Sequence, residues 1–225
     1  MDVGFTLSVY DPVRISALVQ PMGVFVSPQN IQATQAIVRT ELSHSSWAFA
    51  PHGEGMQKGQ AFFHRILTLA EAETETTGLK EAADYLWDRH LEDNLWSQLL
   101  PGAVESLSVL KGAGMRLAVI SNAEGTIDAL LQSLGLRESF EFVLDSTVVG
   151  IAKPDPRIFK LALDRFGLPE NRVVMVGDSL AADVHGAWSA GIAAALIDPL
   201  NLHPTCAAPR FDDLLAFAKA LIPAK

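Results

Sequence analysis

The chain has 225 residues, of which 49% are hydrophobic and 19% charged, and its formal net charge is −9 at pH 7. This length and balance predict one core domain with a modest insertion, or two small domains, with a core large enough to be stable without disulfides. The acidic charge argues against binding the phosphate backbone of nucleic acids but not against a small anionic substrate, because one lysine or a metal ion can dominate the field inside a pocket.

The first long stretch, residues 13–99, shows helical spacing of its apolar residues. We expect helices over 31–42, 57–70 and 79–91, and the polar segment 71–77 predicts a break between the last two. No part of this stretch has a convincing strand pattern. The pattern therefore predicts an all-helical insertion.

From residue 101 onward, helical and strand patterns alternate. The expected helices are 101–111, 124–134, 157–166, 181–190 and 211–221, and the expected strands are 115–120, 140–144, 172–176 and 192–197. Helices that alternate with short, continuously apolar strands indicate a parallel sheet covered on both faces, which right-handed crossovers wind into a doubly wound α/β fold. In such a sheet, ligands bind beyond the carboxyl ends of the strands.

Four segments at these expected strand ends or at the chain start carry polar residues suited to chemistry. They are Asp2 to Thr6, Ser121-Asn122, Lys153-Pro154 and Gly177 to Asp183. A serine hydroxyl with backbone N–H groups at a helix start can hold a phosphate oxygen, and a lysine adds a point charge. Two aspartates five residues apart can approach one hard cation, and another carboxylate can attack phosphorus.

Each segment also has a plainer interpretation when it is taken alone. Ser121 is typical of a helix N-cap, Lys153 of a solvated turn, Asp183 of the first turn of a helix, and Asp2 of a free chain end. Because all four segments occur in a fixed order and three of them follow expected strands, a shared site is the better interpretation.

Together the segments resemble the four motifs of the haloacid dehalogenase superfamily. Its pattern is an Asp-x-Asp-x-Thr loop, a Ser or Thr after the second strand, a Lys before a helix, and a Gly-Asp-x-x-x-x-Asp loop; the matching residues are Asp2 to Thr6, Ser121, Lys153 and Gly177 to Asp183. The resemblance covers essentially the whole chain. It implies a Rossmann-like core formed by 1–12 and 100–225, with a helical cap of the C1 type at 13–99.

The same resemblance implies a Mg²⁺-dependent phosphohydrolase that acts on a small phosphorylated metabolite through an aspartyl-phosphate intermediate. Asp2 is then the nucleophile and a metal ligand, and the backbone carbonyl of Gly4 a second ligand. Asp178 binds the metal directly, and Asp183 orients its water or Lys153. The phosphoryl group is held by Ser121, by the backbone of Asn122 and by Lys153, which also has a catalytic role.

The first motif departs from the family pattern at Gly4. Phosphatases of the family usually carry an acid there, which protonates the leaving alcohol and later activates water. Losing such a group typically lowers the rate by roughly 10²- to 10⁴-fold. We therefore expect aryl or acyl phosphates to be preferred over alkyl phosphates unless another residue substitutes; the candidates are His44, His52, Glu54 and His64.

A second departure concerns the strand that leads into the first motif in the family, which has about five residues. Here only Met1 precedes Asp2. Without that strand its neighbours lose buried hydrogen-bond partners, which is costly. Either the native chain starts upstream, which we expect, or another segment such as 22–27 occupies the position, although that segment is better interpreted as a loop leading into the cap.

Two other functions stay open. A dehalogenase of the same fold would use Asp2 on a carbon–halogen bond without a metal, but it has no need for Asp178 and Asp183. A catalytically weak or silent binding protein is favoured by Gly4 and by the missing strand. Metal dependence separates the first of these from a phosphatase.

Localisation rests on what the sequence lacks. The single cysteine, Cys206, cannot form an internal disulfide, which fits a reducing compartment. The sequence has no apolar run long enough to span a bilayer, and its start lacks a secretory signal pattern. We expect a cytoplasmic protein without nucleic-acid or membrane partners, and the oligomeric state stays open.

Overall fold

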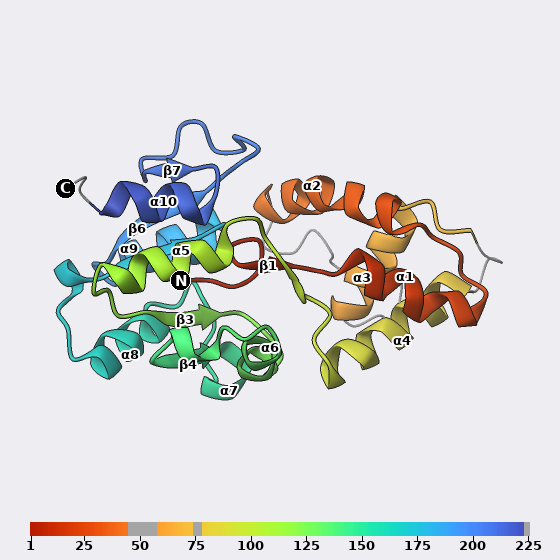
Figure 1. Cartoon of the computed structure of the whole chain (residues 1–225), viewed down its shortest axis with the longest axis horizontal. Helices are drawn as coiled ribbons and strands as arrows, with labels where there is room; N and C mark the ends of the chain where they lie inside the picture. Colours follow the sequence, from red (N-terminus) through yellow and green to blue (C-terminus); the bar gives the residue numbers. More distant parts are fainter. Residues whose placement is uncertain (45–57, 74–77, 223–225) are drawn as a thin grey trace. The chain divides into compact units, whose positions relative to one another are not determined.

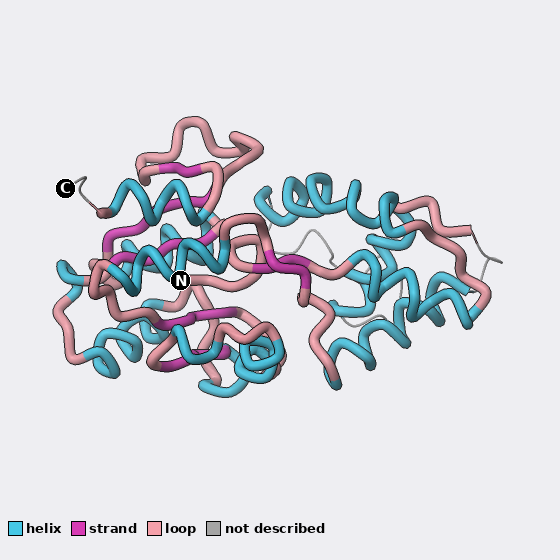
Figure 2. Tube along the Cα trace, viewed as in Figure 1, coloured by secondary structure: helices cyan, strands magenta, loops and turns pink. Residues whose placement is uncertain are grey.

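The computed structural model describes residues 1–44, 58–73 and 78–222, which divide into two compact units. The first unit combines Met1–Val9 with Leu99–Lys225, and the second is Tyr10–Gln98. Helices form the second unit, whereas the parallel strands belong to the first (Figure 2).

The second unit contains four α-helices in its described part, α1 to α4 in Figure 1. Their bounds are Pro12–Val19, Pro28–His44, Lys58–Leu69 and Gly78–Glu92. The last three lie close to the predicted ranges, while α1 was not predicted. Residues at the start of α1 mark it as a helix. Asp11 caps it by accepting hydrogen bonds from the backbone N–H groups of Val13 and Arg14, and Pro12 occupies the first turn.

Aromatic packing holds the second unit together around Tyr10. The Tyr10 ring meets Phe62 and Trp96 edge-on at centroid distances of 5.7 and 5.8 Å. Its hydroxyl shares a hydrogen bond of 2.8 Å with the hydroxyl of Thr34, and burial raises the pKa of Tyr10. Segment 22–27 belongs to this unit, where Phe25 forms an isolated antiparallel bridge with Glu73, so it does not replace a strand of the other unit.

Parallel strands and helices alternate along the first unit, which is an α/β Rossmann-like core. Its parallel strands are β3 (Ala118–Ser121), β4 (Phe142–Asp145), β5 (Val174–Gly177), β6 (Ala193–Ile197) and β7 (Arg210–Phe211). Its α-helices are α5 (Ala103–Gly112), α6 (Ile127–Ser133), α7 (Ser146–Val149), α8 (Pro156–Phe166), α9 (Gly186–Ser189) and α10 (Leu214–Leu221). The predicted fold class is therefore confirmed, although the short elements α7 and β7 were not predicted.

The predicted α-helix over 181–190 is the one element whose type differs. Residues Leu180–His185 form a π-helical turn, and α9 follows it. The wider turn places Asp183 with its side chain fully buried, while Ser179 caps the turn by accepting a hydrogen bond from the N–H of Ala182. Such π-helical turns occur frequently at functional sites.

The parallel strands do not form one continuous sheet in the described chain. Strands β3 and β4 form one sheet, and β5, β6 and β7 form another. Met1 and Asp2 lie between β3 and β5: Met1 donates to the Ala118 carbonyl at 2.8 Å, and Asp2 donates to the Val176 carbonyl at 2.9 Å.

Two short strands form the connections between the units. Strand β1 (Ser8–Val9) pairs with β2 (Gln98–Leu99), and the N–H of Leu100 donates to the carbonyl of Leu7 at 2.9 Å. The chain therefore leaves the first unit and returns to it at neighbouring positions.

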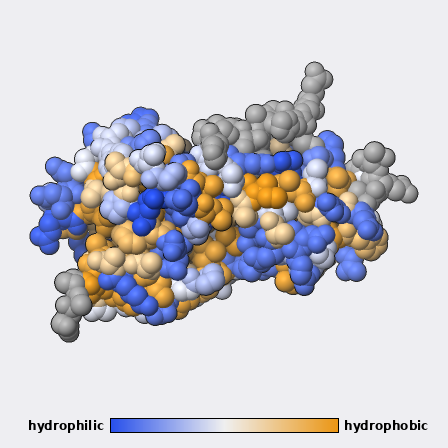
Figure 3. Space-filling view, turned by 90° about the horizontal axis from the view of Figure 1, so that it is seen from above, coloured by the Kyte–Doolittle hydropathy of each residue, from blue (hydrophilic) through white to orange (hydrophobic). Residues whose placement is uncertain are grey.

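The face drawn in Figure 3 carries both hydrophilic and hydrophobic residues. Val148 and Val13 are among the exposed large hydrophobic residues, and single exposures of this kind are common in soluble domains. Among the described helices, none is both long enough and apolar enough to cross a lipid bilayer.

Candidate active site

Three carboxylates converge at the carboxyl ends of the core strands. Asp2 lies between β3 and β5, Asp178 directly follows β5, and Asp183 lies in the π-helical turn beyond it. Each offers an oxygen within 4.8 Å of the other two. These three predicted site residues are thus brought together, although Asp2 lies far from Asp178 and Asp183 in the sequence.

Lys153 lies among these carboxylates and donates a hydrogen bond to each of two of them. Its Nζ donates to Oδ1 of Asp2 at 2.7 Å and to Oδ1 of Asp183 at 2.6 Å, and the lysine is only 6% exposed. Burial alone lowers the pKa of Lys153, but the attraction of Asp183 and Asp2 outweighs burial and raises that pKa. The group is therefore a buried ammonium ion at neutral pH.

Acidic groups outnumber basic ones among these four residues. Asp2 and Asp183 both pair with the one ammonium of Lys153, and the carboxylate of Asp178 lies close to theirs. Burial raises the pKa of Asp183, with Lys153 acting in the opposite direction. A set of carboxylate oxygens that is partly shielded from solvent is the donor chemistry that Mg²⁺ prefers, so the residues present fit such an ion.

The position of Asp183 depends on the absence of a side chain at Gly177. The Oδ2 atom of Asp183 accepts a hydrogen bond from the N–H of Ser179 at 3.0 Å. A Cβ atom added at Gly177 would lie 2.2 Å from the same Oδ2 atom. Because Gly177 has no side chain, the carboxylate of Asp183 can pack directly against the end of β5.

Replacing Gly177 with alanine is expected to displace Asp183 and to weaken Mg²⁺ binding by at least about tenfold. Forcing an atom into a packed interior also costs roughly 1–3 kcal/mol of stability. Calorimetric titration with Mg²⁺ and thermal unfolding measure the two effects. Gly112→Ala is the matched control, since a Cβ there meets no atom within 4 Å. Unchanged Mg²⁺ affinity in Gly177→Ala would contradict this account.

The side chain of Asn122 fixes the backbone that carries Lys153. Its Oδ1 atom accepts a hydrogen bond from the Lys153 N–H, and its Nδ2 atom donates to the Lys153 carbonyl, both at 2.8 Å. The sequence predicted a role only for the Asn122 backbone. The neighbouring Ser121 is buried at the end of β3, opposite Asp145 of β4.

Asp145 organises the loop that follows β3, a role that the sequence did not predict. Its carboxylate accepts hydrogen bonds of 3.0 Å from the N–H groups of Gly125 and Thr147. The adjacent Ser146 accepts a hydrogen bond from the N–H of Ala123 through Oγ at 3.0 Å. The pattern Asp-Ser-Thr after a strand is a helix N-cap signal that could have identified part of this arrangement.

The first motif forms a compact loop. The carbonyl of Val3 accepts hydrogen bonds from the N–H groups of Thr6, Leu7 and Ser8 at 3.2, 2.8 and 3.1 Å. Phe5 is buried with a φ of 49°, a left-handed conformation that is uncommon for a residue with a side chain. Gly4 pairs with Ser8 in a parallel bridge, and its role as a carbonyl ligand stays a prediction.

The residues considered as substitutes for a missing acid are located only in part. His52 and Glu54 lie outside the described residues, and so does the side chain of His44. His64 is half-buried on α3 in the second unit. A catalytic role for any of them stays a prediction.

Comparison with known proteins finds a matching family model and similar curated proteins. The family model described as haloacid dehalogenase-like hydrolase matches residues 24–191. The chain is 35% identical over 153 residues to haloacid dehalogenase-like hydrolase domain-containing protein 3 of Mus musculus, covering 67% of this chain and 60% of that protein. It is 37% identical over 131 residues to phosphoserine phosphatase of Thermus thermophilus, covering 57% of this chain and 52% of that enzyme.

Solved structures share the fold. The Bacillus subtilis putative HAD-hydrolase YfnB, determined with bound magnesium, superimposes with a TM-score of 0.63 at 20% identity and covers 98% of this chain and 96% of its own. At this identity the likeness concerns the fold alone. The chain spans roughly half to three fifths of the length of the two curated relatives described above.

Proposed function

Because the chain belongs to the haloacid dehalogenase-like hydrolase family, we propose that it is a Mg²⁺-dependent phosphohydrolase acting on a small phosphorylated metabolite. The convergence of Asp2, Asp178 and Asp183 around the ammonium of Lys153 carries the proposal. A metal-free attack on a carbon–halogen bond needs no divalent cation, whereas three carboxylates in one place suit one. The phosphatase name of the Thermus thermophilus relative supports phosphate chemistry in the same family.

In the proposed reaction, the carboxylate of Asp2 attacks phosphorus, so that an Asp2–phosphorus bond forms while the bond to the leaving oxygen breaks. Lys153 donates a hydrogen bond to Oδ1 of Asp2, whereas Oδ2 accepts none from the described residues. We therefore assign the attack on phosphorus to Oδ2. The leaving oxygen departs with the electron pair, and water then hydrolyses the aspartyl phosphate and releases inorganic phosphate and free Asp2.

The remaining residues position and neutralise charge. The ammonium of Lys153 lowers the repulsion between the attacking carboxylate and the phosphate dianion, and Asp183 holds this ammonium in place. Ser121 and the backbone of Asn122 are proposed to bind phosphoryl oxygens. Asp2, Asp178, Asp183 and the Gly4 carbonyl would hold a Mg²⁺ ion, which would supply further charge neutralisation.

Gly4 sets the expected substrate preference, because it offers no side chain to protonate the leaving oxygen. Phosphate esters whose leaving group is stable as an anion need no such proton. We therefore propose that aryl or acyl phosphates react faster than alkyl phosphates. We also propose that residues 13–99 act as the substrate-selecting cap of a core made of 1–12 and 100–225.

The experiment is phosphate release from a series of aryl and alkyl phosphates, measured with Mg²⁺ and again after chelation of the metal. We expect release only with Mg²⁺, and a rate that rises steeply as the pKa of the leaving group falls. The variant Gly4→Asp restores an acid at this position and is expected to flatten that dependence.

Each alternative outcome has a distinct meaning. Metal-independent halide release from a 2-haloacid, without phosphate release, replaces the proposal with a dehalogenase. Absence of both activities, together with failure to trap an aluminium fluoride or beryllium fluoride adduct in the presence of Mg²⁺, indicates a silent binding protein. A rate independent of the leaving group contradicts the role assigned to Gly4 but leaves the phosphatase proposal intact.

A further inference from the structure

The backbone of Lys153 lies outside the helices and strands of the first unit. It belongs to the loop between α7, which ends at Val149, and α8, which begins at Pro156. Only 6% of the residue is exposed, and buried backbone N–H and C=O groups need hydrogen-bond partners. No helix or strand supplies these partners here, so the groups that do supply them decide where the lysine side chain starts.

One side chain, that of Asn122, bonds both backbone groups of Lys153. Its Oδ1 atom accepts a hydrogen bond from the Lys153 N–H at 2.8 Å, and its Nδ2 atom donates to the Lys153 carbonyl at 2.8 Å. The amide group therefore pairs with Lys153 as a residue of a neighbouring strand would. A single substitution at Asn122 removes both bonds.

The other end of the lysine is held as well. Its Nζ donates to Asp2 and Asp183 at 2.7 and 2.6 Å. Asp183 is in turn fixed by the N–H of Ser179, which donates to its Oδ2 atom at 3.0 Å. A lysine has a long and flexible stem, so contacts at both of its ends are needed to place the ammonium before a substrate binds.

The loop that carries Asn122 is anchored to the first turn of α7. The Oγ atom of Ser146 accepts a hydrogen bond from the N–H of Ala123 at 3.0 Å, and the hydroxyl of Thr147 donates to the Ala123 carbonyl at 2.6 Å. On its other side, Asn122 follows Ser121, the last residue of β3. The side chain of Asn122 therefore starts from a backbone that is fixed on both sides.

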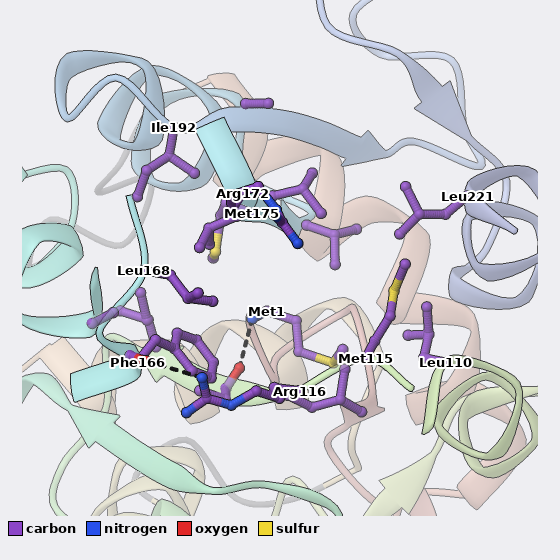
Figure 4. Close-up of a pocket in the computed structure, with 18 of the residues that line it drawn as sticks. Met1, Leu110, Met115, Arg116, Phe166, Leu168, Arg172, Met175, Ile192 and Leu221 are labelled. Atoms are coloured by element: carbon purple, nitrogen blue, oxygen red, sulfur yellow. Dashed lines mark hydrogen bonds between the residues drawn. The ribbon is translucent and has the colours of Figure 1, made fainter. Parts of the chain in front are cut away.

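The backbone of Asp2, the proposed nucleophile, is held by different contacts. The nitrogen of Met1 donates to the Ala118 carbonyl at 2.8 Å, a bond that Figure 4 marks with a dashed line. The N–H of Asp2 donates to the Val176 carbonyl at 2.9 Å. Because neither contact involves Asn122, a substitution there can displace the ammonium of Lys153 while the backbone of Asp2 stays in place.

We propose that Asn122 is a positioning residue for Lys153, whose backbone its side-chain amide fixes so that the ammonium reaches Asp2 and the phosphoryl group. This inference rests on the proposed phosphohydrolase function. It gives the side chain of Asn122 a role separate from the phosphate binding proposed for its backbone. The side chain acts on the rate through the lysine and needs no contact with the substrate.

Two substitutions test the proposal in different ways. Asn122→Ala removes both hydrogen bonds, whereas Asn122→Asp keeps the acceptor for the Lys153 N–H but places a carboxylate oxygen against the Lys153 carbonyl. We expect either variant to lower kcat for phosphate release about 30- to 100-fold, because a small displacement of a reacting group costs up to roughly a hundredfold. Asn171→Ala, which changes an exposed asparagine in the turn before β5, is the matched control and should leave kcat unchanged.

Repeating Asn122→Ala in the Lys153→Met protein separates positioning from a general loss of structure. If the amide acts through the lysine, the second substitution causes little further loss of kcat, so the two effects do not add. Equal losses in the two backgrounds would show that Asn122 only supports the fold, and the proposal would be wrong. All forms are assayed with Mg²⁺ and an aryl phosphate, and near-UV circular dichroism checks their folding.

The NMR signal of the Lys153 ammonium tests the same link without catalysis. A buried ammonium that donates to two carboxylates exchanges its protons slowly with water, and its signal is identified by its loss in Lys153→Met. We expect both Asn122 variants to speed this exchange by about tenfold or more, and Asn171→Ala to leave it unchanged. Unchanged exchange in the folded Asn122 variants would overturn the proposal.

Failure of the proposed function gives a different result from failure of this inference. If the unaltered protein releases no phosphate, the phosphohydrolase proposal fails, and faster ammonium exchange in the Asn122 variants still assigns the placement of Lys153 to Asn122. If the unaltered protein is active but the Asn122 variants keep its kcat, the positioning role is wrong and the phosphohydrolase proposal stands.

Discussion

Replacing Asp2 with asparagine is expected to lower the rate of Mg²⁺-dependent phosphate release by roughly 10⁴- to 10⁶-fold, the range typical of removing a nucleophile. An amide oxygen attacks phosphorus poorly, yet it can still accept the hydrogen bond that Lys153 donates at 2.7 Å. The size and shape of the side chain are conserved, so the chain should stay folded. Single-turnover kinetics measure the loss, and circular dichroism checks the fold.

The matched control is Asp164→Asn, which changes an exposed aspartate on α8. Its kcat should equal that of the unaltered protein. Mass spectrometry after rapid quenching adds an independent observation: a phosphoryl group is expected on the peptide containing Asp2, and none in Asp2→Asn. Phosphate release at an undiminished rate in Asp2→Asn would show that another residue attacks the substrate.

Replacing Lys153 with methionine is expected to lower the free energy of unfolding by about 3–5 kcal/mol at pH 7 without metal, the typical cost of leaving a buried charge unpaired. Both Asp2 and Asp183 lose their counter-ion, and Asp183 is fully buried. Phosphate release should fall sharply as well. Urea denaturation at several pH values, with and without Mg²⁺, measures the stability.

The sign of the pH dependence is specific. Burial already raises the pKa of Asp183, and loss of the lysine removes the group that opposes this shift. As the pH falls through that raised pKa, protonation removes the unpaired charge, so the stability difference from the unaltered protein should shrink. Added Mg²⁺ should also reduce it, since the ion supplies the missing positive charge.

Lys160→Met is the control for this substitution, because Lys160 is exposed on α8, a few residues beyond the loop that carries Lys153. It is expected to change the unfolding free energy by no more than about 0.5 kcal/mol. A similar loss of stability in both variants, or a loss in Lys153→Met that does not respond to pH or Mg²⁺, would mean that the lysine stabilises the core by packing rather than by charge.

Periodicity predicted the alternation of the core because buried strands and amphipathic helices differ in both length and spacing. The apolar run ending at Ile120 and the helical pattern ending at Phe166 correspond to β3 and α8. Strand β3 begins later than predicted, at Ala118, since β4 provides a paired partner only from Phe142 onward. The residue at which a strand starts depends on the strand that it pairs with, and the local sequence pattern holds no information about that partner.

The charged residues of the candidate site could be predicted from the sequence, but the hydrogen bonds that hold the surrounding loops could not. Asp178, Asp183 and Lys153 occur at expected strand ends, and the topology of a parallel sheet brings such ends together. The two hydrogen bonds between the Asn122 side chain and the backbone of Lys153 join residues 31 positions apart and have no periodic signature in the sequence. The same holds for Asp145, whose partners Gly125 and Ile127 precede it by 20 and 18 residues.

Pairing of β1 with β2 has an evolutionary consequence. Since residues 8–9 and 98–99 run side by side, the intervening segment begins and ends at one point of the α/β fold, and its removal or replacement requires only a short turn to close the gap. Different lineages can therefore acquire new helical modules at this junction while the order of the core strands stays the same. The helical segment can then vary in sequence without a change in the strands and loops that carry Asp2, Asp178, Asp183 and Lys153.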